Sequence, residues 1–185
     1  MTGSYPDHSA KNEPKKVPFE NSYWVQPGLL LAGEYPARTD SADDLKRLKA
    51  LAEIGIHHFI DLTEDDQTIK YWENIADLEA FKGDEHSHKQ FYVQDYSVPS
   101  TEKMIEILDV IDAAVEAGEP AYVHCHAGIG RTGTVIGCYL VRHGLKPGEA
   151  VEAIANLRMH TPYFWRSSPE TTEQFQFIQS WKNGQ

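Results

Sequence analysis

The sequence predicts an α/β fold in which a central mixed sheet of about five strands carries helices on both faces. Two observations support this class. Short apolar segments, such as 56–62 and 121–123, are typical of buried strands, and the segments between them place apolar residues at helical spacing. The length of 185 residues, with 41% hydrophobic and 24% charged residues, is typical of a single globular domain.

The first half of the chain opens with a polar stretch, so we expect a disordered tail over residues 1–17 and a folded domain over 18–185. Turn residues predict hairpins, and capping residues with glycine stops mark helix ends. The elements predicted in order are a hairpin of strands at 23–25 and 29–31, a helix from a cap among Thr39, Asp40 and Ser41 to about Ile54, a strand at 56–62, a helix at 71–81 and a strand at 90–94.

The second half begins with the clearest helix, which Ser100 or Thr101 caps and Gly118 ends. Its core face is predicted by apolar residues three and four positions apart. That face consists of Met104, Leu108, Ile111 and Val115. The elements predicted after it are the strand at 121–123, a helix at 132–144, a short helix from Pro147 or Gly148 to about Met159, and a last helix capped by Ser168 and opened by Pro169.

The segment 123–133 joins a strand, a glycine-rich loop and a helix N-terminus around Cys125 and Arg131. Such a loop binds anions, because its backbone N–H groups point inward and the helix dipole adds positive potential. Arg131 can offer two parallel N–H donors to two oxygens of a tetrahedral oxyanion. The same potential favours the thiolate form of Cys125. The segment therefore predicts a sulfur nucleophile aimed at a phosphorus atom.

The run His124-Cys125, five residues, then Arg131-Thr132-Gly133 resembles the signature loop of the cysteine-based protein tyrosine and dual-specificity phosphatases. The resemblance is to the compact, atypical or bacterial dual-specificity type, and it implies a phosphatase-like fold with this loop at the carboxyl edge of a central strand. It assigns phosphate binding, together with Arg131, to His126, Ala127, Gly128, Ile129 and Gly130. His126 departs from the family pattern, in which a small residue is usual there.

The resemblance also implies a phosphomonoester hydrolase that works through a cysteinyl-phosphate intermediate. Cys125 is the expected nucleophile, and Thr132 can hydrogen-bond its thiolate. Asp95 follows a predicted strand and has a proline four residues later, as the general acid of dual-specificity phosphatases does. A carboxylic acid on such a loop can protonate the leaving oxygen. His124 is expected to orient the loop backbone.

Two supporting residues each carry two interpretations. Glu34 could lie beside Arg131 and hold it, or be a loop carboxylate in water. Gln174 could position the hydrolytic water, or pack within the last helix. Neither a cofactor nor a metal is expected, because the loop itself supplies positive charge. The spacing of His86 and His88 resembles a metal pair only weakly, since no third ligand lies nearby.

The expected substrate is phosphotyrosine in a protein or peptide, with dual specificity possible. The five loop residues include no lysine, Ile129 offers an apolar contact for a ring, and the aromatic run 163–165 could line the pocket. The net charge of −11 predicts no nucleic-acid or membrane partner. We expect a cytoplasmic protein, because the two cysteines form no disulfide framework and a nucleophilic thiol needs a reducing compartment. We also expect a monomer.

Three alternatives remain open at this level. One is a phosphatase of phosphoinositides or inositol phosphates. Another is a catalytically silent module that binds a phosphorylated ligand. A rhodanese-like sulfurtransferase would also place a cysteine in a strand–loop–helix unit, but it would need neither Asp95 nor the Arg131-Thr132-Gly133 ending.

Overall fold

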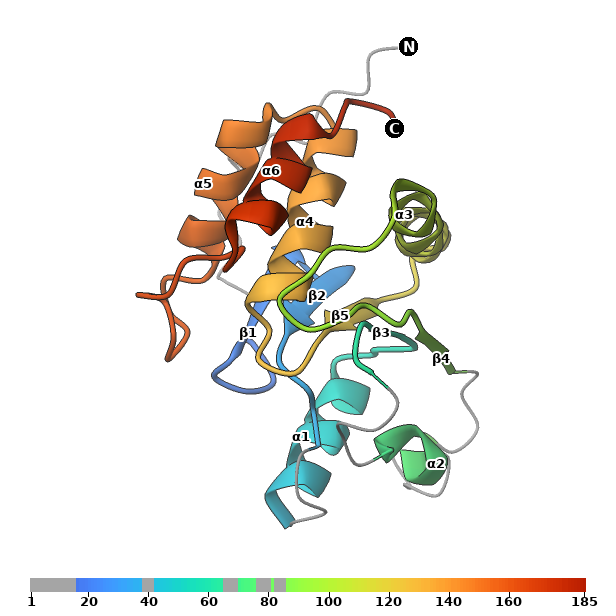
Figure 1. Ribbon diagram of the computed structural model, residues 1–185. Coiled ribbons are helices and arrows are strands. Elements are labelled where there is room, and N and C mark those ends of the chain that lie inside the picture. The colour runs from blue at the N-terminus through green and yellow to red at the C-terminus, as the bar shows by residue number, and fades with distance from the viewer. Residues whose placement is uncertain (1–15, 38–41, 65–69, 76–80, 82–85) are drawn as a thin grey trace.

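A five-stranded mixed sheet in the order β1-β2-β5-β3-β4 lies at the centre of the computed structural model (Figure 1). The structure describes residues 16–37, 42–64, 70–75, 81 and 86–185. The strands are β1 (Ser22–Gln26), β2 (Leu30–Gly33), β3 (His58–Asp61), β4 (Ser87–Gln90) and β5 (Ala121–His124). Only β1 and β2 pair antiparallel, whereas β2, β5, β3 and β4 run parallel. The parallel strands therefore all end at one edge of the sheet.

Helices cover both faces of this sheet, which confirms the predicted class (Figure 1). The helices are α1 (Ala42–Glu53), α2 (Tyr71–Ile75), α3 (Thr101–Ala117), α4 (Gly130–Arg142), α5 (Pro147–Leu157) and α6 (Thr172–Ser180). The last four helices lie on one face, and α1 and α2 lie on the other. Within the described ranges, no helix combines the length and the apolar character needed to cross a membrane.

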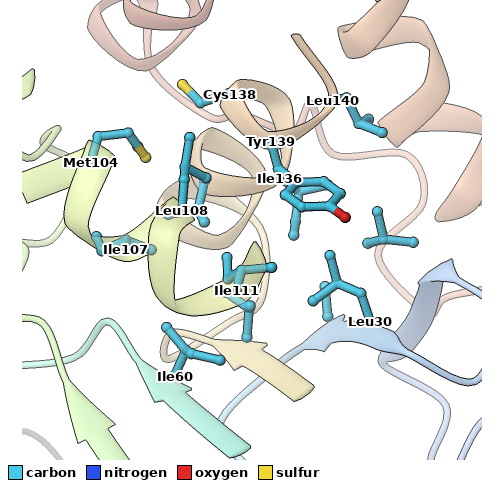
Figure 2. Close-up of a cluster of buried hydrophobic side chains, with 14 of the residues drawn as sticks. Leu30, Ile60, Met104, Ile107, Leu108, Ile111, Ile136, Cys138, Tyr139 and Leu140 are labelled. Carbon is cyan, nitrogen blue, oxygen red and sulfur yellow. The ribbon is translucent and has the colours of Figure 1, made fainter. Parts of the chain in front are cut away.

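Successive residues of β5 point to opposite faces, so the strand serves two cores. Val123 packs into the first core, between the sheet and α3 to α6, whereas Tyr122 packs into the second core, against α1 and α2. Figure 2 shows part of the first core, where α3 and α4 meet over the sheet. The labelled side chains there include Ile60, Met104, Ile107, Leu108, Ile111 and Ile136. This sandwiching fixes β5, and with it the position of the loop that follows.

The strand predicted at 90–94 lies earlier in the chain, at Ser87–Gln90. Its last ladder bond is donated by the N–H of Phe91 to the carbonyl of Asp61, 2.7 Å away. Phe91 and Val93 are buried while Tyr92 is exposed. β3 ends at Asp61, and its pairing with β4 therefore stops at Gln90.

The last helix begins at Thr172, capped by Thr171, and not at Pro169 with a Ser168 cap. Ser168 has another partner, because its hydroxyl donates to the carbonyl of Ile129 at 2.7 Å. The tail predicted over residues 1–17 and the caps among residues 39–41 lie almost wholly outside the described residues. The described part opens at Lys16, and Val17 already packs against the second core.

A buried polar group on the second face joins β3, β5 and α2. The imidazole Nε2 of His124 lies 2.7 Å from the hydroxyl of Tyr71. Its Nδ1 lies 3.8 Å from the Asp61 carboxylate, too far for a hydrogen bond. Burial lowers the pKa of His124 to about 4, and the nearby Asp61 carboxylate only partly opposes this shift. His124 is therefore neutral at physiological pH.

The carboxylate of Asp61, which lies beside His124 in this buried group, is ionised at physiological pH. Burial alone would raise its pKa, but His124, His88 and two hydrogen bonds from Thr63 outweigh that effect and hold the pKa below its usual range. The imidazole Nε2 of His88 lies 3.2 Å from Oδ2 of Asp61, and the His88 ring stacks on the ring of Trp72. His88 therefore lies on an ordered strand, β4, and joins the buried polar group at Asp61.

The depressed pKa of His124 predicts a loss of stability on acidification. An unfolded histidine takes up a proton near pH 6.5, whereas His124 stays neutral until pH falls to about 4. Unfolding therefore binds a proton across this window, and stability falls as pH falls. His124→Asn should reduce the pH slope of the unfolding free energy between pH 6.5 and 5 by up to one proton, about 1.4 kcal/mol per pH unit. Urea titrations at several pH values measure this slope.

The control for this prediction is internal. Above pH 7 histidine is neutral in both states, so the slopes of the two proteins should agree there even if His124→Asn is less stable throughout. An undiminished slope between pH 6.5 and 5 would contradict a neutral, buried His124.

Candidate active site

The loop from Cys125 to Gly130 follows β5 and leads directly into α4. Gly128 brings this loop against the end of β2. Its φ is +70°, and a Cβ on it would lie 2.4 Å from the carbonyl carbon of Gly33. A side chain at this position would be both strained and obstructed. The loop thus lies tightly on the neighbouring strand, and Cys125 is only 3% exposed at its start.

Three carbonyls of the loop bond to groups outside it. His126 O accepts from the N–H of Tyr35 at 3.2 Å, and Ala127 O accepts from the Asn21 amide at 3.1 Å. Ile129 O accepts from the Ser168 hydroxyl. In a trans peptide the carbonyl and the following N–H point in opposite directions. Outward carbonyls therefore turn the next N–H groups toward the loop centre, which is the arrangement that binds an anion.

Arg131 is almost fully buried, and the two edges of its guanidinium differ. Nη1 donates to the carbonyl of Val93 at 3.0 Å and to that of Leu62 at 3.4 Å. Within the described part of the chain, Nε and Nη2 have no hydrogen-bond acceptor. These two N–H groups form the parallel pair that binds two oxygens of a phosphate or carboxylate. The predicted phosphate clamp thus has its donors in place.

Two carboxylates face this arginine. Asp95 Oδ1 lies 3.0 Å from Nη2, although the N–H direction makes this an ion pair and not a hydrogen bond. Glu64 Oε2 lies 3.9 Å from Nη1. The backbone N–H of Asp95 also points to Glu64, at 3.4 Å. The structure therefore brings the predicted acid, Asp95, to the predicted phosphate clamp, and its side chain remains 45% exposed.

Glu64 also joins the site; the sequence offered it, with Asp66, only as the acid to consider next if Asp95 is not the general acid. The signal that located Asp95 also applies to Glu64, since both follow parallel strands that end at the same edge.

Thr132, the predicted partner of the thiolate, is fully buried, and its hydroxyl lies 3.5 Å from the carbonyl of Gly33. Its bond to the thiolate stays a prediction.

Glu34 does not hold Arg131, contrary to one interpretation of the sequence. Its carboxylate pairs with Arg47 at 2.7 Å and accepts from Asn21 at 3.0 Å. The strand order explains the difference. Glu34 follows β2, on one side of β5, whereas the Arg131 side chain reaches toward the carbonyls after β3 and β4, on the other side. Glu34 instead orients Asn21, which holds the loop at Ala127.

Gln174 lies in the first turn of α6 and is fully buried. Its amide oxygen accepts from two backbone N–H groups of residues 170 and 171, and its amide nitrogen donates to Ser97 O at 3.0 Å. Of its two interpretations, packing within the last helix agrees with these contacts. A third carboxylate, that of Glu170, lies beside it over Gly130.

The remaining predicted site residues differ in how far they are buried. His124 lies among the rings of Tyr35, Tyr71 and Tyr122, where it can orient the backbone before Cys125. His126 is exposed at the loop surface, whereas Ile129 is fully buried and cannot contact a substrate ring. The aromatic run 163–165 is exposed, and the buried Arg158 holds its backbone through the carbonyls of Tyr163 and Arg166.

Comparisons with known proteins agree with this geometry. A family model described as "Swiss Army Knife protein, DSP-PTPase phosphatase domain" (PTP-SAK) matches residues 19–178. Dual specificity protein phosphatase CDC14AB of Danio rerio is 31% identical over 145 residues, which are 75% of this chain. That alignment is 22% of the relative, so the chain spans about a fifth of the CDC14 proteins that it matches.

Two further relatives extend over more of both chains. Phosphatidylglycerophosphate phosphatase PTPMT2 of Arabidopsis thaliana is 29% identical over 168 residues, covering 89% of this chain and 68% of the relative. The crystal structure of Tk-PTP in the active form has a TM-score of 0.62 and 25% identity, covering 85% of this chain and 93% of that one. The chain therefore belongs to the dual-specificity and tyrosine phosphatase superfamily, as a DSP-PTPase phosphatase domain of the Swiss Army Knife family.

Proposed function

We propose that this phosphatase hydrolyses phosphotyrosine in proteins through a cysteinyl-phosphate intermediate. The observation that carries the proposal is the buried Arg131, which lies in the first turn of the helix that follows the Cys125 loop and whose Nε–H and Nη2–H groups have no hydrogen-bond acceptor in the described part of the chain. We place a tetrahedral phosphate on these donors and on the N–H groups of the loop, with its phosphorus against the sulfur of Cys125.

In the first step the thiolate of Cys125 attacks phosphorus, and the bond from phosphorus to the substrate oxygen breaks. Asp95 donates its proton to that leaving oxygen. In the second step Asp95 accepts a proton from water, whose oxygen attacks the phosphocysteine and releases inorganic phosphate with the thiolate. Arg131 and the loop N–H groups stabilise the charge on the equatorial oxygens in both steps. Thr132 stabilises the thiolate as it leaves.

The charges around the site favour a substrate with one phosphate. Glu64 and Asp95 lie beside the clamp, and the loop residues 126–130 contain no lysine or arginine. These two carboxylates would repel the additional phosphates of an inositol polyphosphate. Tyr96 follows the acid directly and is 59% exposed, so its ring is available to contact the phenyl group of a phosphotyrosine.

A second candidate is a lipid phosphomonoester. It is favoured by the similarity to PTPMT2, a protein named as a phosphatidylglycerophosphate phosphatase, over most of both chains. Phe164 and Trp165 add to it, because they are 60% and 71% exposed and could contact acyl chains. The net charge of −11 weighs against approach to an anionic membrane surface, so phosphotyrosine remains the first choice.

The cysteinyl-phosphate mechanism predicts that Cys125→Ser lowers turnover of 4-nitrophenyl phosphate to less than about one hundredth, because a serine hydroxyl is far less ionised than a thiol. Steady-state assays with circular dichroism measure activity and fold together. The matched control is Cys138→Ala, which removes the other cysteine from the first core and should keep the activity of the folded protein. Substantial turnover by folded Cys125→Ser would exclude the mechanism.

The substrate proposal predicts a ranking of catalytic efficiency. Phosphotyrosine peptides should be hydrolysed best, phosphoserine and phosphothreonine peptides slowly, and phosphoinositides and inositol polyphosphates poorly. The assay is phosphate release from equal concentrations of each class, with phosphatidylglycerophosphate in mixed micelles as a further substrate. A preference of about tenfold, or 1.4 kcal/mol in transition-state binding, for either lipid class would overturn the phosphotyrosine proposal.

A further inference from the structure

The loop that carries Asp95 turns sharply in an unusual conformation. The N–H of Ser97 donates to the carbonyl of Gln94 at 3.1 Å, so Asp95 and Tyr96 occupy the middle of a tight turn. Tyr96 has φ +59°, in the left-handed region that glycine or asparagine normally occupies in such a turn. A bulky residue stays in this region only when its surroundings hold it there.

This conformation sets the direction of the acid. The N–H of Tyr96 donates to Asp95 Oδ1 at 3.0 Å, and the same oxygen lies 3.0 Å from Nη2 of Arg131. A change in φ at Tyr96 would rotate the peptide group that carries this N–H, together with the Asp95 side chain, relative to the chain that follows. The position of the Asp95 side chain therefore depends on whatever fixes the two peptide groups after Tyr96.

The N-terminus of α6 fixes these two peptide groups. The hydroxyl of Thr171 donates to the carbonyl of Tyr96 at 3.3 Å, and the amide nitrogen of Gln174 donates to the carbonyl of Ser97 at 3.0 Å. Thr171 and Gln174 also form the capping box of the helix. The same two side chains thus satisfy the helix end on one side and the turn after Asp95 on the other.

Gln174 is held in one orientation. Its oxygen accepts from the backbone N–H groups of Glu170 and Thr171 at 3.1 and 3.2 Å, so its nitrogen must face Ser97. The side chain is fully buried and also lies on Gly130, since a Cβ there would be 3.1 Å from either amide atom. It therefore touches the phosphate loop and the acid loop at once.

We propose that Gln174 is a positioning residue for the general acid, and that it acts on Asp95 through Ser97 and the left-handed turn at Tyr96. This inference rests on the proposed role of Asp95. It assigns Gln174 a role in the first chemical step and not in holding the water of the second.

The test uses leaving groups of different basicity. Phenyl phosphate needs the acid more than 4-nitrophenyl phosphate does, because phenoxide is the poorer leaving group. Gln174→Glu keeps an oxygen acceptor for the capping box but replaces the donor to Ser97 by an oxygen. It should lower kcat for phenyl phosphate by about ten- to a hundredfold and that for 4-nitrophenyl phosphate by less than about threefold.

Gln174→Met covers the possibility that a buried carboxylate prevents folding, because it is neutral and of similar size. It should give the same selective loss. Ser180→Ala, at the last residue of the same helix, should leave kcat for both substrates unchanged. In an Asp95→Asn background neither Gln174 variant should cause a further loss with phenyl phosphate, because the acid they position is already absent.

The outcomes separate this inference from the proposed function. If Asp95→Asn itself fails to discriminate between the two leaving groups, the assignment of the acid is wrong. If Asp95→Asn discriminates and the folded Gln174 variants do not, only the positioning role is overturned. A burst of phenol followed by equally slow turnover of both substrates would also overturn it, because that result places Gln174 in the second step.

Discussion

The interaction on which the site depends is the bonding of Arg131 to the carbonyls of Leu62 and Val93. A buried guanidinium is costly unless its N–H groups are satisfied and its charge is neutralised. Here one edge is satisfied by the backbone beyond β3 and β4, and the charge is offset by Asp95 and Glu64. These acceptors exist because three parallel strands end at one edge of the sheet. The same bonding leaves the other edge of the guanidinium available for a substrate.

The pleat of β5 gives the two residues at its end different environments. His124 points into the second core, where tyrosine rings and Asp61 surround it, and Cys125 points toward the first core. The burial that lowers the pKa of His124 to about 4 also keeps the imidazole uncharged. A neutral ring does not add a second positive charge to the anion site, so the positive potential there comes from Arg131, the loop N–H groups and the helix dipole.

Local patterns predicted the parts of the site that are local in sequence. Cys125, Arg131 and the loop between them lie in one strand–loop–helix unit, and Asp95 follows a strand whose carboxyl end had to share that edge. The structure brings Asp95 to within 3.0 Å of Arg131. Glu34 could not be placed in the same way, because its distance from Arg131 depends on the strand order, which no short segment encodes. The boundary of β4 was wrong for a similar reason, since a strand ends where its neighbour ends.

The glycines of the loop region are required for two different reasons, one conformational and one of packing. Gly128 needs its conformation, but Gly130 and Gly133 make room for the segment before α6. A Cβ on Gly130 would lie 2.8 Å from Glu170 Oε2, and one on Gly133 would lie 2.2 Å from the Ser168 hydroxyl. Residues some forty positions later in the chain therefore pack directly on the first turn of α4. Side chains at these two glycines would separate α6 from the phosphate loop, and the turn at Tyr96 would lose the helix end that holds it.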